Sequence, residues 1–266
     1  MMIKNVKTKS VPMANNAAEL GGNLRKTDSE KITVIRGNLV LEKDTTFENS
    51  IRVEGDIVGK AGRRYNLKVK GDIHLVGDIH ARNICTIGNI RAKGKIRTDG
   101  NIRAQDIHTN GNIHTAGDIH ARNINVDESI DVSGNINAKG NINVWNINAQ
   151  NIHTAGDIKA LNIHARNIKI FGRIDATNID ALGDIYARGD IYLWIDIRAR
   201  NIKTLGEINA LNINVDSTIS AKAIIFEYLT LLYNGKEGLI CKNLICKRST
   251  HESEDNICVY RKYRDV

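Results

Sequence analysis

Isoleucine recurs along most of the chain at intervals of five or six residues, and this spacing restricts the fold more than any other feature. Between Ile73 and Ile219 the chain has 27 such isoleucines, separated by 16 intervals of six residues and 10 intervals of five. Such spacings scatter successive isoleucines around an α-helix, so they build no apolar stripe on it. The periodicity therefore excludes a helical fold for this region.

Each isoleucine begins a short apolar–polar–apolar unit, as in Ile79-His80-Ala81. Residues i and i+2 of a strand point to one face, and residue i+1 points to the other. Each unit is thus predicted to be a three-residue strand with two inward side chains and one outward side chain.

The residues between the units predict two kinds of corner. Asn or Asp precedes the isoleucine at 22 of the 27 sites, and both residues are typical of turns. Gly stands two residues before the isoleucine in 13 of the 16 six-residue intervals and in none of the five-residue ones. We interpret this Gly as the extra residue of a longer corner, placed there to take a positive φ.

Three units close one coil, because Ile79 to Ile96 and Ile96 to Ile113 each span 17 residues. Coils of equal length stack with like residues on like residues. The sequence predicts an all-β, single-stranded parallel β-helix, a triangular solenoid with about 17 residues per coil. A left-handed hexapeptide helix keeps roughly 18 residues per coil, so the five-residue intervals favour the right-handed type.

The solenoid is predicted to span residues 32–246. Residues 1–31 hold the only proline and show no strand periodicity, so we expect a disordered or capping tail there. Residues 247–266 are expected to form a loop, a short strand and a charged tail. About 13 coils with strands roughly 4.8 Å apart give a rod on the order of 60 Å long. The basic segment 59–65 interrupts the pattern, and we favour a corner insertion over a ligand site.

Nucleic acid is disfavoured as a partner, although the chain is basic. The net charge is +8, which suits acidic partners. The densest basic run nevertheless spreads over three predicted faces, and few aromatic residues interleave with it for base stacking. This basic belt consists of Arg91, Lys93, Lys95, Arg97 and Arg103.

Composition favours a cytoplasmic protein without a membrane span. The chain has four cysteines in 266 residues, which is typical of a reducing compartment rather than a disulfide scaffold. Residues 1–15 contain no apolar signal-peptide core. The most apolar run, residues 221–233, is interrupted by charges and is shorter than the roughly 20 residues that a spanning helix needs.

We expect no metal and no other cofactor. Seven of the eight histidines occupy outward positions, where the 17-residue period stacks them with other types, as in the column His80, Arg97, His114. A column that mixes Arg with His is a poor ligand set. Such exposed histidines predict a change in association or solubility between about pH 5 and 7. A zinc site is the alternative at Cys241, Cys246, His251 and Cys258, but the first two fall at inward positions, where Cys acts as a small hydrophobe.

No catalytic arrangement is found in the sequence. Hexapeptide acyltransferases share the triangular coil, but the chain has no long loop that carries a His away from the coils. A phosphate-cradling loop and a Ser-His-Asp arrangement are also missing. We therefore predict that the protein is not an enzyme.

The unit Gly-Asp-Ile-x-Ala, as in residues 77–81 and 183–187, resembles that of bactofilins, the polymer-forming bacterial cytoskeletal proteins. The resemblance covers residues 32–246 and rests on this unit and on coils of 16 to 18 residues. It implies a right-handed triangular β-helix that polymerises end to end without nucleotide and serves as a cytoplasmic scaffold.

Two functions stay open. The first is a scaffolding rod that associates with itself through its ends, because terminal coils leave strand edges unpaired. Its contacts are predicted at Leu39, Phe47, Phe226, Leu231 and Leu244. The alternative is a binding module that recognises a glycan or a protein through exposed aromatic residues. The residues of this second surface are Trp145, Tyr186, Tyr192 and Trp194.

Overall fold

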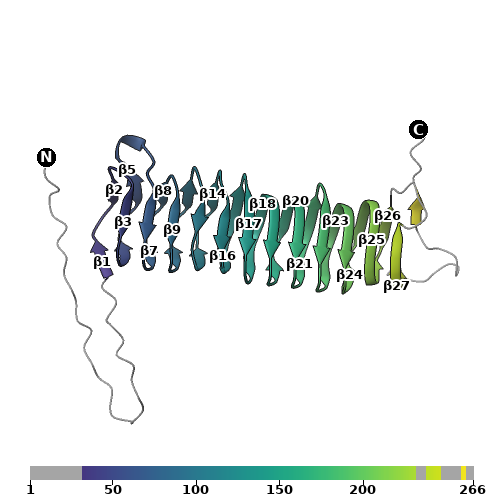
Figure 1. Ribbon diagram of the computed structural model, residues 1–266. Helices are drawn as coiled ribbons and strands as arrows, with labels where there is room; N and C mark the ends of the chain where they lie inside the picture. The colour runs from purple at the N-terminus through teal and green to yellow at the C-terminus, as the bar shows by residue number, and fades with distance from the viewer. Residues whose placement is uncertain (1–31, 232–237, 247–258, 262–266) are drawn as a thin grey trace, which may run out of the picture.

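A computed structural model describes residues 32–231, 238–246 and 259–261, and these form one rod of stacked β-strands (Figure 1). All 28 strands belong to one sheet, and every strand pair is parallel. The sheet winds through about 12 turns, with about 17 residues between equivalent positions. The predicted all-β parallel solenoid is confirmed, and the right-handed sense stays a prediction. The tail 1–31 and most of 247–266 lie outside the described residues.

Strands in the first half of the rod are short, as predicted. They are β1 (Ile32–Ile35), β2 (Leu39–Leu41), β3 (Thr45–Phe47), β4 (Ser50–Val53), β5 (Ile57–Gly59), β6 (Leu67–Val69), β7 (Ile73–Leu75), β8 (Ile79–Ala81), β9 (Ile84–Thr86), β10 (Ile90–Ala92), β11 (Ile96–Thr98), β12 (Ile102–Arg103), β13 (Asp106–Thr109), β14 (Ile113–Thr115) and β15 (Ile119–Ala121).

Several strands of the second half are longer, because the extended backbone continues through corners. The strands are β16 (Asn123–Val132), β17 (Asn135–Ala138), β18 (Ile142–Thr154), β19 (Ile158–Lys159), β20 (Asn162–Ile170), β21 (Ile174–Ala181), β22 (Asp184–Ala187), β23 (Ile191–Thr204), β24 (Glu207–Asn209), β25 (Asn212–Phe226), β26 (Tyr228–Leu231), β27 (Leu239–Cys246) and β28 (Val259–Arg261).

The ladders define three faces of the rod. The first face begins with β1, β4, β7, β10 and β13. The second face begins with β2, β5, β8, β11 and β14, and the third with β3, β6, β9, β12 and β15. A long strand contributes to more than one face. In β18, for example, Ile142, Ile147 and Ile152 belong to the first, second and third faces.

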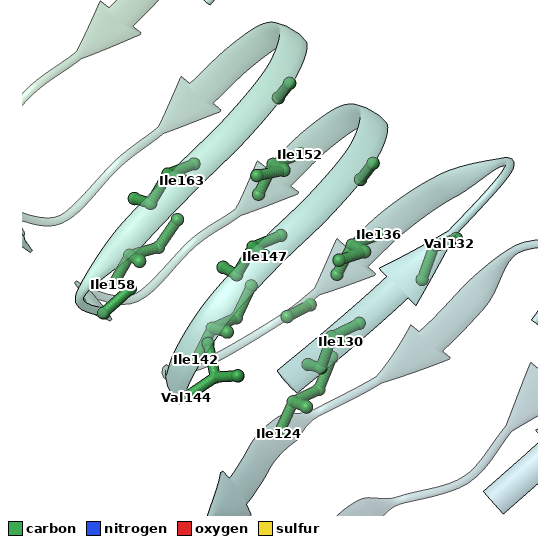
Figure 2. Close-up of a cluster of buried hydrophobic side chains, with 14 of the residues drawn as sticks. Ile124, Ile130, Val132, Ile136, Ile142, Val144, Ile147, Ile152, Ile158 and Ile163 are labelled. Carbon is green, nitrogen blue, oxygen red and sulfur yellow. The ribbon is translucent and has the colours of Figure 1, made fainter. Parts of the chain in front are cut away.

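The isoleucines fill the interior as stacked columns. All 27 of them are at most 2% exposed, and each pairs with its equivalent one turn away, as Ile96 does with Ile79 and Ile113. Figure 2 shows Ile124, Ile130 and Ile136 pointing inward, one from each face of a single turn. Burial of a whole isoleucine side chain contributes about 1.5–3 kcal/mol, so these columns are the main stabilising element of the rod.

The Asn and Asp residues lie at corners, as predicted, but their hydrogen bonds go to the next turn. At glycine corners the side-chain oxygen accepts a backbone N–H one turn on, as Asp118 does from Asn135 at 2.7 Å. At tight corners the Asn amides bond to one another, as Asn167 donates to Asn151 at 2.8 Å. Because buried or half-buried polar groups need partners, these ladders tie each turn to its neighbour.

The predicted reason for the repeat glycines is wrong. Among the described glycines only Gly37 and Gly62 have positive φ, and neither belongs to the repeat. The repeat glycines are needed because consecutive turns approach closely there. A Cβ added to Gly94 would lie 2.5 Å from the carbonyl oxygen of Gly77 and also against Oδ1 of Asp78. The backbone conformation is ordinary, and the lack of a side chain is the requirement.

The six-residue corners that lack this glycine form bulges. Three of the six-residue intervals carry Glu128, Ile195 or Ser217 at the glycine position. At each of them the strand continues and the pairing register shifts against a shorter neighbouring corner. A bulge places the extra residue outside the ladder, so the side chains at these corners point away from the core.

The basic segment 59–65 contains the short 3₁₀ helix η1 (Lys60–Gly62). It lies between β5 and β6 and lengthens one turn to 22 residues, from Ile51 to Ile73. Lys60 forms an ion pair of 2.8 Å with Glu42 of the preceding turn. The segment thus acts as a corner insertion, as we favoured.

Candidate functional site

The first turn, which consists of β1, β2 and β3, forms the amino-terminal end of the described rod. β1, β2 and β3 pair with β4, β5 and β6, and among the described residues no strand pairs with their outer edges. Leu39 and Phe47 are half-buried and pack against the core from this end. An apolar surface ringed by unpaired backbone groups is a template for another strand edge.

The carboxy-terminal end is formed by β27 and β28. β27 stacks on β25 and β28 stacks on β26, with no further strand beyond them in the described part of the chain. Leu244, Leu239, Cys241 and Cys246 are half-buried side chains of this terminal turn that pack against the core. This end therefore repeats the arrangement of an apolar interior bounded by free strand edges.

Two of the residues predicted as end contacts lie one turn inside the rod. Phe226 is 0% exposed because Cys246 stacks on it, and Leu231 is buried beneath β28. Leu39, Phe47 and Leu244 do lie in the terminal turns. The sequence signal for this distinction was the Leu-x-Cys pattern at residues 239–246, which continues the repeat beyond Phe226.

The four aromatic residues of the alternative binding surface do not share one face. Tyr192 extends from the first face and Tyr186 from the third. Trp145 and Trp194 lie on the edge between the first and second faces, three turns apart. The negative charge of Asp190 raises the pKa of Tyr192 above its usual value. Recognition of a glycan or a protein by these residues stays a prediction.

The predicted His and Arg columns are present. His80, Arg97 and His114 are stacked in register on the second face. His114 also contacts the carboxylate of Asp131 on the next turn at 3.0 Å. The basic belt is divided as expected, with Arg91 on the first face and Arg103 on the third. Three shallow surface grooves, one on each face, are lined in part by these columns.

Cys241 and Cys246 occupy inward positions, stacked on Ala221 and Phe226. Burial raises the pKa of the Cys241 thiol, which favours the neutral thiol over a metal-binding thiolate. The other two residues of the zinc alternative, His251 and Cys258, lie outside the described residues. Within the described ranges no group of three or more His, Cys, Asp or Glu side chains could hold a metal ion.

Within the described residues, no helix has the length and apolar character needed to cross a membrane.

Comparison with known proteins gives one match, over the first half of the rod. No curated protein and no solved structure matches the chain. Residues 33–137 match the model of the bactofilin family, described as polymer-forming cytoskeletal. The match covers the first strand and the turns up to β17, and the same ladder continues from there to β27. Residues 33–137 are thus similar to the bactofilin family, and they lie within a longer solenoid of the same construction.

Proposed function

We propose that the protein is a non-enzymatic scaffold that polymerises by joining its rods end to end. The proposal rests on the apolar residues and the strand edges of the two terminal turns. Each presents half-buried apolar residues, and the outer edges of β1 to β3 and of β27 have no partner strand among the described residues. The similarity of residues 33–137 to the bactofilin family adds support, because that family is described as polymer-forming.

Parallel stacking explains how one rod would join the next. Inside the rod, each turn buries its apolar interior against the next and pairs its strands in the same register. A terminal turn offers the same groups at the same spacing, so an incoming end extends the ladder without a new kind of contact. No nucleotide is needed in this scheme, since burial and backbone hydrogen bonds supply the free energy.

We place the protein in the cytoplasm. Cys85, Cys241 and Cys246 are free thiols in the structure, which agrees with a reducing compartment. The family description as cytoskeletal points the same way.

The proposal is tested by pelleting purified protein in an ultracentrifuge without nucleotide. Leu39→Glu and Leu244→Glu each place a charge in one terminal turn, and Leu205→Glu places it on the side of the rod, where Leu205 is exposed. We expect the wild type and Leu205→Glu to pellet and the two end variants to stay in the supernatant. Circular dichroism and thermal melting check that the variants keep the solenoid. Pelleting by both folded end variants would contradict the proposal.

The same variants report which ends meet. If unlike ends join, each end variant alone is a monomer and an equal mixture of the two forms pairs. If like ends join, each variant alone forms pairs through its intact end. Either result is read by sedimentation velocity and is compatible with polymerisation.

A further inference from the structure

One edge of the rod carries a row of apolar side chains, most of them exposed, that is interrupted at one turn. It is the edge between the first and second faces, and we call the row the apolar edge. Its members are Trp145, Leu161, Trp194, Ile195 and Leu211, of which the first four are 58%, 49%, 78% and 41% exposed. Thr177 occupies the one turn between Leu161 and Trp194.

Backbone hydrogen bonds place these residues directly above one another. The N–H of Leu161 donates to the carbonyl of Trp145 at 2.7 Å, and that of Thr177 donates to Leu161 at 2.8 Å. Two turns on, Leu211 donates to Ile195 at 2.9 Å. The row therefore runs straight along the rod for five turns, which is about 19 Å at roughly 4.8 Å per turn.

Two exposed apolar residues on the other edges of the rod lie among charged ones. Leu205 lies between Arg188 and Lys222 of the neighbouring turns, and Leu182 lies between Arg166 and Arg200. Single exposed apolar residues are normal, whereas a row of them along one edge indicates an interaction surface. Two members of the apolar edge, Trp194 and Ile195, protrude at a bulge, where core packing does not require them to be apolar.

The charges beside the apolar edge indicate the partner. Lys159 on the first face is stacked against Asp175 of the next turn. On the second face, His164 contacts the carboxylate of Asp180 on that same next turn, at 3.3 Å. The turn of Leu161 thus has Lys159 on one side of the edge and the imidazole of His164 on the other, and the turn of Thr177 has a carboxylate on both sides.

We propose that a second copy of this chain lies antiparallel along the apolar edge. The two-fold axis crosses the edge between the turns of Leu161 and Thr177. Such an axis reverses the rod but brings the first face of one copy beside the first face of the other. Leu161 then meets Thr177 of the second copy, and Trp145 meets Trp194 and Ile195.

Charge selects this register over its neighbours. With the axis between the two turns, Lys159 meets Asp175 and His164 meets Asp180 of the second copy. A shift that centres the axis on either turn brings Lys159 onto Lys159 or Asp175 onto Asp175. A parallel pair brings Lys159 beside His164, and Asp175 beside Asp180. Like charges in contact disfavour both alternatives.

The lateral pairing is separate from the end-to-end contact and does not depend on it. Its test therefore uses disulfide trapping rather than filament formation. The four native cysteines are replaced by alanine, and two separate proteins carry Asn146→Cys and Ile195→Cys. These positions lie beside the two tryptophans and leave both rings in place. The proteins are oxidised alone and as an equal mixture, and the products are separated under denaturing, non-reducing conditions.

We expect a disulfide-linked pair in the mixture and none in either protein alone. In the proposed register the turn of Asn146 meets the turn of Ile195 of the second copy, whereas two identical positions lie three turns, roughly 14 Å, apart. A disulfide needs Cα atoms within about 7 Å. No pair in the mixture, or pairs formed by each protein alone, would overturn the proposal.

Charge variants test the register independently. In the same cysteine background, Lys159→Glu is expected to lower the yield of the mixed pair about tenfold. Adding Asp175→Lys to it restores the yield, because the opposite charges then face each other again. Lys169→Glu is the matched control on the third face, and it leaves the yield unchanged. Equal yields for Lys159→Glu and this control contradict the charge argument.

The experiments distinguish a failure of the lateral pairing from a failure of end-to-end polymerisation. If the proposed end-to-end function fails, the mixed disulfide still forms between single rods. If the lateral pairing fails, the wild-type protein still pellets, and its filaments have the width of one rod.

Discussion

The backbone N–H of Lys95 donates a hydrogen bond of 2.7 Å to Oδ1 of Asp78, which lies one turn earlier in the rod. The preceding residue, Gly94, faces that same carboxylate and the backbone of Gly77. The acidic residue of one corner therefore bonds to the backbone of the next corner, and the glycine of that next corner leaves room for it. Solenoid stability is a sum of such contacts between neighbours.

Gly94→Ala is predicted to lower stability by about 1–3 kcal/mol. The added Cβ meets the carbonyl of Gly77, which belongs to the backbone of a paired turn and has little room to move. Thermal unfolding followed by circular dichroism measures the change. Glu128→Ala is the control at an equivalent corner that has no glycine, and it is expected to leave stability nearly unchanged. Equal melting temperatures for the wild type and Gly94→Ala would contradict this view of the corner.

Thr115→Val is predicted to destabilise the rod by about 1–3 kcal/mol although the two side chains have similar shapes. The Thr115 hydroxyl is buried, donates to the carbonyl of Gly100, receives a bond from Thr98 at 2.7 Å and one from the N–H of Gly117 at 3.2 Å. Valine leaves the N–H of Gly117 without this acceptor, whereas the Thr98 hydroxyl and the Gly100 carbonyl can still bond to each other at 2.8 Å. In the described residues no buried side-chain nitrogen or oxygen lacks a partner.

Thr46→Val provides the comparison for this prediction, because Thr46 points outward from β3 and is exposed. Its replacement is expected to change stability by less than about 0.5 kcal/mol. Chemical denaturation of both variants gives the two free energies. If both substitutions cost the same, the buried hydroxyl has no special role.

The contribution of the Arg122–Asp106 pair is predicted to disappear in acid. Hydrogen bonds from Arg122 hold the pKa of Asp106 below its usual 3.8. A carboxylate with a lowered pKa stabilises the fold above the usual value and loses this effect as the pH falls through its folded pKa. Because both side chains are partly exposed, we expect less than about 1 kcal/mol.

The pH dependence is measured as the difference in unfolding free energy between the wild type and Arg122→Ala. That difference should be constant from pH 5 to 7 and should shrink as the pH falls below about 3.8. Lys93→Ala removes an exposed cation that forms no ion pair with any described residue, and it should show no such trend. A difference for Arg122→Ala that persists at pH 2 would show that lost packing, not charge, is responsible.

The two tryptophans give an optical readout of the apolar edge. Trp145 and Trp194 are the only tryptophans in the chain, and both are exposed in a single rod. Their emission is predicted to shift to shorter wavelength as the protein concentration rises, because pairing buries both rings. Lys159→Glu should keep the long-wavelength emission to higher concentration. The absence of any concentration dependence in the wild type would count against pairing.

Much of the fold is readable from the sequence, because the isoleucine spacing fixes which residues share an interior column. The pairing of Ile79, Ile96 and Ile113 follows from the 17-residue period alone. The role of Gly94 does not, since a spacing pattern shows where a glycine stands and not whether its φ or its missing Cβ matters. Only the distance between consecutive turns distinguishes these reasons.

The candidate sites are less predictable, because they depend on which way a corner side chain points. Tyr192 and Trp194 are two residues apart in the sequence, yet one extends from a face and the other from an edge. Tyr192 is the outward residue of its three-residue unit, whereas Trp194 is the first residue of the corner that follows. Similarly, Phe226 looked terminal in sequence but is covered by the turn of Cys246.

Negative-stain electron microscopy of the purified full chain, at physiological salt and without nucleotide, tests the central claim most directly. The account predicts filaments with an axial repeat near the length of one rod, about 60 Å, and their loss in Leu244→Glu but not in Leu205→Glu. Isolated rods at every protein concentration would contradict end-to-end polymerisation.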